Sequence, residues 1–345
     1  MKKDDVLSDW NEENEQIDQK NARKLVWRTR ISIGFTVIRT LLLVLLLYLL
    51  YVIPMQVYYD MSGKQAGFDR MVTTLVETRN PGITVDKSGA GQSASINPLL
   101  TQKTTQTVYR RVGDWEVAAG KITAKKRLFG KLHYTLDLKE KYLNDDFVSS
   151  FAIAPDLLGE DSLAEDAPTG FSLSEQLNKI EDGYVAQVKF AAKQGMAPGE
   201  LIDLLADYNV EIYQMAVYGG EITEINMPFS RAGQFTFAST LLLRPATEYD
   251  DKNRHSSSYL SLTTKESLAA AEKQFFEDLE WLIENGNYPD KKIDEQRLDY
   301  LNQHGIQVFG ATVTGPVREI ERLEEKELLH QFQLGGIEVW KWQER

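Results

Sequence analysis

The chain has 345 residues, a net charge of −12 and no cysteine. The absence of cysteine excludes disulfide bonds, thiolate metal sites and a cysteine nucleophile. Residues 1–30 carry seven basic and seven acidic side chains, so the acidic excess lies in the rest of the chain. Because a nucleic-acid-binding surface needs a basic patch, the composition predicts no direct nucleic acid binding.

The N-terminal segment has a helical pattern. An acidic block at residues 4–18 precedes a basic block at residues 20–30, an order that suits the helix macrodipole. Four apolar side chains recur at helical spacing within the acidic block: Val6, Leu7, Trp10 and Ile17. Two interpretations remain open. The segment is either a solvated tail whose basic half contacts anionic membrane lipid, or a helix whose apolar positions become buried when a cytoplasmic partner binds.

One long apolar run follows this segment. Residues Thr40 to Tyr59 form 20 positions without a charge, and Leu41 to Leu50 contain eight leucines. A helix rises about 1.5 Å per residue, so this run spans the roughly 30 Å hydrocarbon core of a bilayer. A cleaved signal peptide has a shorter apolar region that ends in small residues. The run therefore predicts an uncleaved transmembrane helix over residues 37–57.

The charges beside this helix predict its orientation. Six basic residues lie between positions 20 and 39, and only three lie over a similar distance beyond the run. The positive-inside rule then places the N-terminus in the cytoplasm and the large C-terminal domain outside, in a single-pass protein of the cell membrane. Long arginine side chains can reach lipid headgroups, and tyrosines suit an interfacial belt. The predicted membrane-boundary residues are Arg28, Arg30, Arg39, Tyr58 and Tyr59.

Beyond the membrane the pattern predicts an α+β fold. Residues 84–107 are rich in Gly, Ser, Thr and Gln and are expected to form a loop. Strands are expected at residues 115–124 and 132–138, joined by a turn around Gly130. A further acidic loop is expected at residues 156–183.

The C-terminal part predicts two strand-helix-strand units. In the first, residues 184–190 alternate as a half-buried strand, a helix opens at Pro198, and residues 210–218 form a second strand. In the second, an alternating strand begins near Phe309, a helix covers residues 317–323, and strand signals surround a turn at Gly335-Gly336. Between the units, apolar side chains at helical spacing predict a long amphipathic helix over residues 268–282.

The sequence carries no recognisable catalytic chemistry. The four histidines are scattered through different elements, without the HExxH spacing of a zinc site. Neither a GxSxG nor a Walker motif occurs. The acidic pairs are abundant because the domain as a whole is acidic, so each is expected to be solvated surface. We therefore predict that the protein is not an enzyme and has no catalytic residues, cofactor or metal.

Several motifs resemble the sigma-factor regulators of bacteria. The basic run at residues 23–30 and the Leu-rich span are similar to the N-terminal region of that family. Residues 183–190, with the helix and strand that follow, resemble the start of its C-terminal region, and residues 309–316 and 337–342 resemble its end. The resemblance implies a single-pass membrane anti-sigma factor. Its cytoplasmic segment would hold an extracytoplasmic-function sigma factor, and its outer domain would govern release in response to envelope state.

The resemblance and the pattern together predict five segments along the chain. They are a sigma-factor-binding segment (1–36), the transmembrane helix (37–57), a juxtamembrane region with linker strands (58–155), the acidic loop (156–183) and the C-terminal α+β domain (184–345). The alternative is a membrane-anchored extracytoplasmic scaffold of the cell envelope without a sigma-factor role. The sequence leaves open whether release uses proteolysis, a conformational change or a second membrane regulator.

Overall fold

A computed structural model describes residues 4–87, 92–139, 151–158, 173–222 and 237–341. For residues 4–20, 92–93, 174 and 237–239 it describes the backbone alone. The chain divides into two compact units, Met1–Tyr58 and Tyr59–Arg345, which are treated separately below. Residues 159–172, half of the predicted acidic loop at 156–183, lie outside the described residues. The described part contains the short helix Leu173–Leu177, so the loop prediction is wrong there.

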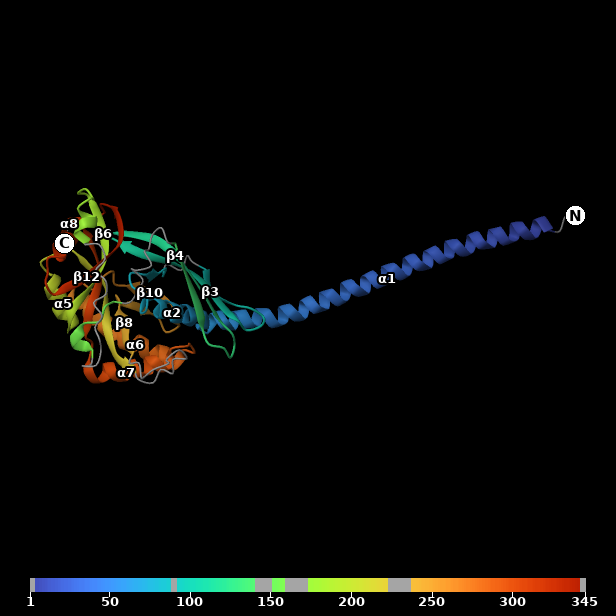
Figure 1. Ribbon diagram of the computed structural model, residues 1–345. Coiled ribbons are helices and arrows are strands. Elements are labelled where there is room, and N and C mark those ends of the chain that lie inside the picture. The colour runs from blue at the N-terminus through green and yellow to red at the C-terminus, as the bar shows by residue number, and fades with distance from the viewer. Residues whose placement is uncertain (1–3, 88–91, 140–150, 159–172, 223–236, 342–345) are drawn as a thin grey trace, which may run out of the picture. The chain divides into compact units, whose positions relative to one another are not determined.

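The first unit is made by helix α1, Asp4–Met61, which is blue in Figure 1. The separate N-terminal and transmembrane helices that we predicted form one continuous helix of 58 residues. The physical reason is the absence of a breaker, since residues 21–39 contain one glycine and no proline. Within the described part of the chain, one helical stretch, residues 21–61, is long and apolar enough to cross a membrane.

The second unit begins with helix α2, Lys64–Glu77, and a first antiparallel sheet. Its strands follow the order β1-β3-β4-β5, and β2 also pairs with β3. They are β1 (Thr84–Val85), β2 (Gln92–Ile96), β3 (Gln102–Val112), β4 (Trp115–Lys126) and β5 (His133–Leu138). The predictions for β4 and β5 are confirmed, whereas the predicted loop at residues 84–107 is wrong.

Strand β3 was missed because its inward-facing side chains are largely polar. Thr104, Gln106, Val108 and Arg110 alternate along it and are all buried. The carboxylate of Asp69 on α2 accepts hydrogen bonds from Thr104 Oγ1 at 2.6 Å and Gln106 Nε2 at 3.1 Å. A buried polar group is tolerated when it is hydrogen-bonded, so a distant helix makes this polar strand stable.

A second antiparallel sheet has the strand order β12-β6-β11-β7-β8. Its strands are β6 (Tyr184–Met196), β7 (Glu211–Ile222), β8 (Phe237–Leu243), β11 (Val308–Pro316) and β12 (Leu329–Val339). Both β6 and β7 run antiparallel to β11, which lies between them, and β6 lies between β11 and β12. The strands of the two predicted units therefore interleave in one sheet, in the order of the split βαβ motif.

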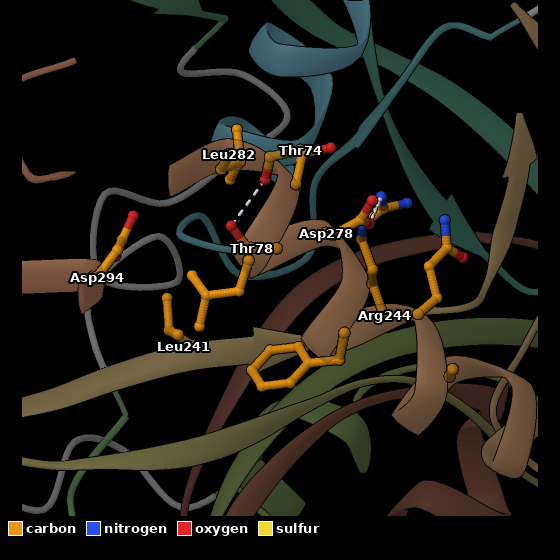
Figure 2. Close-up of a pocket in the computed structure, with 11 residues that line it drawn as sticks. Thr74, Thr78, Leu241, Arg244, Asp278, Leu282 and Asp294 are labelled. Atoms are coloured by element: carbon orange, nitrogen blue, oxygen red, sulfur yellow. Dashed lines mark hydrogen bonds and ion pairs between the residues drawn. The ribbon is translucent and has the colours of Figure 1, made fainter. Parts of the chain in front are cut away.

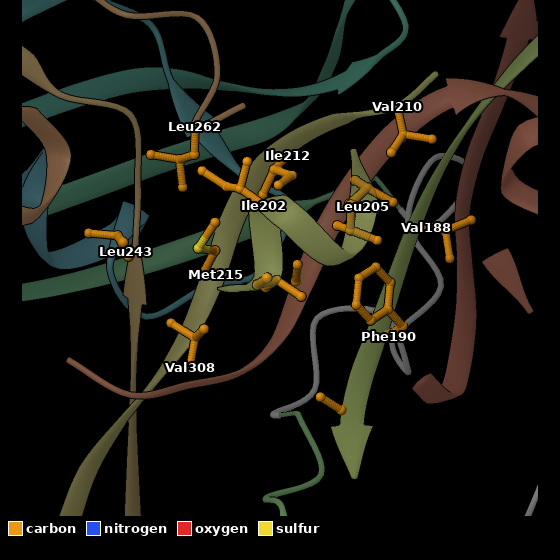
Figure 3. Close-up of a cluster of buried hydrophobic side chains, with 14 of the residues drawn as sticks. Val188, Phe190, Ile202, Leu205, Val210, Ile212, Met215, Leu243, Leu262 and Val308 are labelled. Atoms are coloured by element: carbon orange, nitrogen blue, oxygen red, sulfur yellow. The ribbon is translucent and has the colours of Figure 1, made fainter. Parts of the chain in front are cut away.

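Helices cover one face of this second sheet. They are α4 (Leu173–Leu177), α5 (Pro198–Leu205), α6 (Lys265–Asn285) and α8 (Val317–Leu323). The predicted helix starts at Pro198 and Val317 are confirmed, because proline there occupies or directly precedes the first helical position. Figure 3 shows the resulting core, in which Ile202 and Leu205 of α5 meet Phe190 and Met215 of the sheet.

The other face of the second sheet is also buried, which corrects the half-buried prediction for β6. Gln187 of β6 accepts hydrogen bonds from Arg110 Nε at 3.0 Å and Nη2 at 2.8 Å, and Thr314 Oγ1 accepts from Gly113 N at 2.6 Å. Phe151 packs edge-on against Phe309 of β11, with ring centroids 6.4 Å apart. The first sheet and the segment at residues 151–157 thus cover the face of the second sheet that lies opposite its helices.

The remaining elements differ further from the sequence predictions. The predicted turn at Gly335-Gly336 lies inside β12, where a register shift between Leu334 and Gly336 absorbs the glycines. Helix α7 (Lys291–His304) and strand β8 were not predicted. The last elements are a 3-10 turn, Pro155–Leu157, and the hairpin of β9 (Thr247–Tyr249) and β10 (His255–Ser258).

Candidate functional site

The second unit is held to its first helix, α2, by buried ion pairs. Helix α2 starts three residues after α1 ends, so it is the segment through which the chain of the candidate membrane helix continues into the folded unit. Its apolar side chains enter a core with β1, β3 and β4, and its charged side chains reach α6 and the end of β8. Arg79, just after α2, reaches α7. This contact surface is the candidate functional site, because a change elsewhere in the second unit can reach α2 only through such contacts.

The first ion cluster centres on Arg244, which follows β8. Its Nη1 lies 2.9 Å from Oε2 of Glu77, the last residue of α2, and its Nη2 lies 2.7 Å from Oδ2 of Asp278 on α6. Figure 2 shows Arg244 and Asp278 pointing toward each other. Lys87 Nζ adds a contact to Glu77 Oε2 at 3.1 Å, and Arg70 Nη2 adds one to Asp278 Oδ1 at 3.0 Å. Two carboxylates thus hold three cations.

Arg70 is held in place by more than charge. Its guanidinium lies 4.5 Å from the centroid of the Tyr249 ring and 4.3 Å from that of Trp281. Its Nη1 donates a hydrogen bond to Asn253 Oδ1 at 2.9 Å. The flat guanidinium stacks on aromatic faces and binds in fixed directions, which an ammonium group cannot do. Arg70 therefore ties the middle of α2 to α6 and to the β9–β10 hairpin at once.

Burial and charge shift the pKa values in this cluster in opposite directions. Burial lowers the pKa of Lys87, and the carboxylate of Glu77 opposes that shift. Burial also disfavours the charged form of Arg244, but the carboxylates of Glu77 and Asp278 outweigh it and raise its pKa. Burial raises the pKa of the neighbouring Tyr249 hydroxyl to about 12. At neutral pH the Tyr249 phenol is therefore neutral, beside the charged guanidinium of Arg244.

A second cluster centres on Asp294 of α7, whose side chain is fully buried. Its carboxylate accepts hydrogen bonds from Arg79 Nη2 at 2.6 Å, Arg297 Nη1 at 2.7 Å and the Tyr288 hydroxyl at 2.8 Å. Arg79 lies two residues after α2, so this cluster fixes the end of that helix to α7. Burial raises the pKa of Tyr288, and Asp294 adds to the shift, so the phenol stays neutral and donates.

Two cavities adjoin the clusters. A small one of about 20 Å³ lies among Thr74, Thr78, Leu241, Phe275 and Leu282, with Arg244, Asp278 and Asp294 at its edges (Figure 2). It has room for about one water molecule. A larger cavity of about 360 Å³ lies between β3, β7 and the β9–β10 hairpin. Its lining is mixed, and its polar side chains include Lys87, Arg110, Arg111, Glu77, Glu116 and three tyrosines, Tyr109, Tyr213 and Tyr259.

The larger cavity is lined by charged side chains that are held in place. Its basic side chains are engaged within the protein: Arg110 with Gln187, Arg111 with the Leu260 carbonyl at 3.1 Å, and Lys87 with Glu77. Within the described part of the chain, no three His, Asp or Glu side chains gather as metal ligands do. The arrangement can hold water or a small polar molecule among fixed charges.

Comparison with known proteins shows what part of this chain is similar to. Residues 177–336 match the sigma factor regulator C-terminal family. We call this matching stretch the regulator region. That family is regulatory and non-enzymatic, which agrees with the prediction that the protein is not an enzyme.

A curated relative supports the same family. The chain is 38% identical over 48 residues to "Probable anti-sigma-M factor YhdL" of Bacillus subtilis (strain 168). The match covers 14% of this chain and 13% of that protein, so the chain spans a small part of that relative's length. No solved structure matches the chain significantly.

Each ion cluster has some of its side chains in the regulator region, residues 177–336, and the others before it. Asp278, Arg244, Asp294 and Arg297 all lie within it, whereas Glu77, Lys87, Arg70 and Arg79 precede it. The ion clusters therefore join the regulator region to the segment that leads to the candidate membrane helix.

The structure places the predicted site residues in two groups. Val6, Leu7, Trp10 and Ile17 belong to α1, and their side chains lie outside the described ones. Arg28, Arg30, Arg39 and Tyr58 are exposed along the same helix. Tyr59 differs from its neighbour: it is 4% exposed, against 61% for Tyr58, so it is buried rather than free to face headgroups.

The ion clusters were missed by sequence reasoning, although a signal existed. Asp278 lies three positions after Phe275 and four before Leu282, on the apolar stripe of α6. Glu77 likewise follows Leu75 and Val76 on the buried side of α2. An acidic residue on an apolar stripe indicates a buried carboxylate that needs a cation. What the sequence could not supply was the identity of that cation.

Proposed function

We propose that this protein is a single-pass membrane anti-sigma factor. In this proposal residues 1–36 lie in the cytoplasm and hold an extracytoplasmic-function sigma factor, and the regulator region outside the membrane governs release in response to envelope state. The match of residues 177–336 to the sigma factor regulator C-terminal family carries the proposal. The short match to a protein named as a probable anti-sigma factor and the candidate membrane span support it.

The proposed binding surface is the apolar side of the N-terminal helix. At about 100° per residue, Val6, Leu7, Trp10 and Ile17 fall on one side of a helix. A segment this short cannot bury them within itself, so their apolar surface is available to a partner. The acidic side chains around them would complement the basic surfaces of a sigma factor, and the basic residues nearer the span would contact membrane lipid.

The proposed route for the signal passes through α2. A change in the regulator region would act on Arg70, Glu77 and Arg79, and only two residues separate α2 from α1. Buried ion pairs suit such a role because breaking one leaves an uncompensated charge and is therefore costly. A second membrane regulator could act at either unit without changing this route.

The proposal is tested on the N-terminal helix. Leu7→Asp combined with Trp10→Ala should release the sigma factor and turn on its regulon without envelope stress. Burying one large apolar side chain is worth about 1.5–3 kcal/mol, so losing Trp10 alone should weaken binding by roughly tenfold or more. Reporter transcription and co-purification of the sigma factor with the full-length protein measure the two effects.

The matched control puts the same substituents on the opposite side of the helix, as Ser8→Asp with Gln19→Ala. At equal protein level in the membrane this control should keep the reporter silent. An unchanged reporter in the Leu7→Asp, Trp10→Ala variant would remove this side of the helix from the mechanism. If no sigma factor co-purified with the unaltered protein, the scaffold interpretation would replace the anti-sigma proposal.

Orientation is tested separately. A reporter enzyme active only outside the cytoplasm should be active when fused after Gln65 and silent when fused before Arg39, because six basic residues flank the N-terminal side of the span. The measurement is reporter activity normalised to the amount of fusion protein. The reverse pattern would place the regulator region in the cytoplasm and overturn the proposed signal path.

A further inference from the structure

Two turns of the first sheet expose large apolar side chains to solvent. The turn between β2 and β3 carries Leu99, which is 83% exposed. The turn between β4 and β5 carries Leu128, 54% exposed, and Phe129, 91% exposed. A phenylalanine exposed to this extent beside two leucines is unusual on a surface that only meets water.

Strand register brings these two turns together. Gln102, the first residue of β3, pairs with Lys126, the last residue of β4. The β2–β3 turn immediately precedes Gln102, and the β4–β5 turn immediately follows Lys126. Both turns therefore lie at one end of the sheet, and we call this end, residues 97–103 and 125–133, the sheet tip.

The sheet tip is strongly basic in an acidic chain. It carries five basic side chains and no carboxylate, although the chain as a whole has a net charge of −12. The five are Lys103, Lys125, Lys126, Arg127 and Lys131. The α6–α7 connection contacts the β4–β5 turn through Asn287. The backbone carbonyl of Asn287 accepts a hydrogen bond from Leu132 N at 2.7 Å, and its Nδ2 donates one to the Gly130 carbonyl at 3.2 Å.

The same end of the sheet receives the chain from the candidate membrane helix. Asp69, near the start of α2, accepts hydrogen bonds from Ala94 N at 2.9 Å and Thr104 Oγ1 at 2.6 Å, close to the sheet tip. Glu77, the last residue of α2, instead accepts one from Val85 N at 2.8 Å, far from the tip along β3. Helix α2 thus runs away from the tip, and its first residue, Lys64, lies at the tip end, three positions after α1.

We propose that the sheet tip docks on the lipid surface of the membrane that α1 spans. Leu99, Leu128 and Phe129 insert among the lipid headgroups, and the five basic side chains contact anionic lipid phosphates. Apolar side chains flanked by lysine and arginine are the combination that binds an anionic bilayer surface. The outer unit would then be attached to the membrane twice, through α1 and through the sheet tip.

This inference goes beyond the anti-sigma proposal and depends only on α1 crossing a membrane. A sigma-factor assay and a docking assay can therefore fail independently. Membrane insertion of α1 itself is checked by resistance of the full-length protein to alkaline extraction.

Docking is tested with single cysteines, since the natural chain has none. Phe129→Cys places a label on the sheet tip, and Ala118→Cys places a matched label at an exposed position toward the other end of β4. Each full-length variant is labelled with an environment-sensitive fluorophore and reconstituted into vesicles of phosphatidylcholine and phosphatidylglycerol. Spin-labelled lipid then reports contact with the bilayer, and iodide reports contact with water.

The label at position 129 should show blue-shifted emission, quenching by spin-labelled lipid and protection from iodide. The label at position 118 should show the opposite on all three measures. If both labels were quenched by iodide and neither by lipid, the proposal would be overturned. Protection from iodide at position 129 without lipid quenching would also overturn it, because the tip would then contact another copy of the protein.

The basic side chains are tested in the same system. Combining Lys125→Gln, Lys126→Gln and Arg127→Gln in the Phe129→Cys background should remove most of the dependence of lipid quenching on phosphatidylglycerol. Each basic residue near an anionic surface contributes about fivefold to binding. Quenching that rose with phosphatidylglycerol as before would show that these three residues do not contact lipid and would overturn the proposed mode of docking.

Discussion

Replacing Asp278 with alanine is expected to lower the free energy of unfolding by about 3–5 kcal/mol. The Asp278 carboxylate, 5% exposed, is contacted by Arg244 Nη2 at 2.7 Å and Arg70 Nη2 at 3.0 Å. Removing it leaves one carboxylate, Glu77, beside Arg244 and Lys87, and leaves Arg70 without its acidic partner in this cluster. Urea unfolding of the detergent-solubilised full-length protein measures the change.

The adjacent residue provides a matched control. Glu277 on the same helix pairs with Lys273 at 3.5 Å, but its side chain is 56% exposed. An exposed pair contributes about 0.2–1 kcal/mol, so Glu277→Ala should change the free energy of unfolding by no more than about that amount. Similar losses from both substitutions would show that the buried position of Asp278 is not what makes it important. Asp278→Asn, which keeps the shape and one acceptor oxygen, should fall between the two.

Phe190→Ala should be comparably damaging for a different reason, with a loss of about 3–5 kcal/mol in the free energy of unfolding. Phe190 lies in β6, is fully buried, and belongs to the core between the second sheet and its helices (Figure 3). Its ring centroid lies 5.4 Å from that of Phe332 on β12. Truncation removes apolar contacts and leaves a cavity that β6, buried on both faces, has little freedom to fill.

Phe129→Ala is the control for this substitution, because it removes the same ring from a position that is 91% exposed. Its free energy of unfolding in detergent should stay within about 0.5 kcal/mol of the unaltered protein. A large loss at Phe129 would mean that this ring packs against the protein, which would contradict its exposure. A small loss at Phe190 would contradict its place in the core of the regulator region.

Local features of the sequence were enough to predict several elements. The transmembrane span could be predicted because a helix of its 20 uncharged residues is as long as a bilayer is thick. Helices α5 and α8 could be predicted because Pro198 and Pro316 mark their starts. Helix α6 could be predicted because its apolar residues recur at helical spacing. These signals depend only on neighbours in the chain.

The tertiary structure decided the elements whose stability comes from distant partners. Strand β3 carries Thr104, Gln106 and Arg110 inward, and it forms a buried strand only because Asp69 and Gln187 lie where those groups can hydrogen-bond. The position of β11 between β6 and β7 likewise follows from pairing across more than ninety residues of sequence.

The same distinction separates the parts of the candidate site. Asp278 and Glu77 stand on apolar stripes, so the sequence determined that a carboxylate would be buried at each position. Only the fold decided that both would meet Arg244, which lies 34 positions from Asp278 and 167 from Glu77. A buried charge requires an opposite charge within about 4 Å, and which residue comes that close depends on how the helices pack on the sheets.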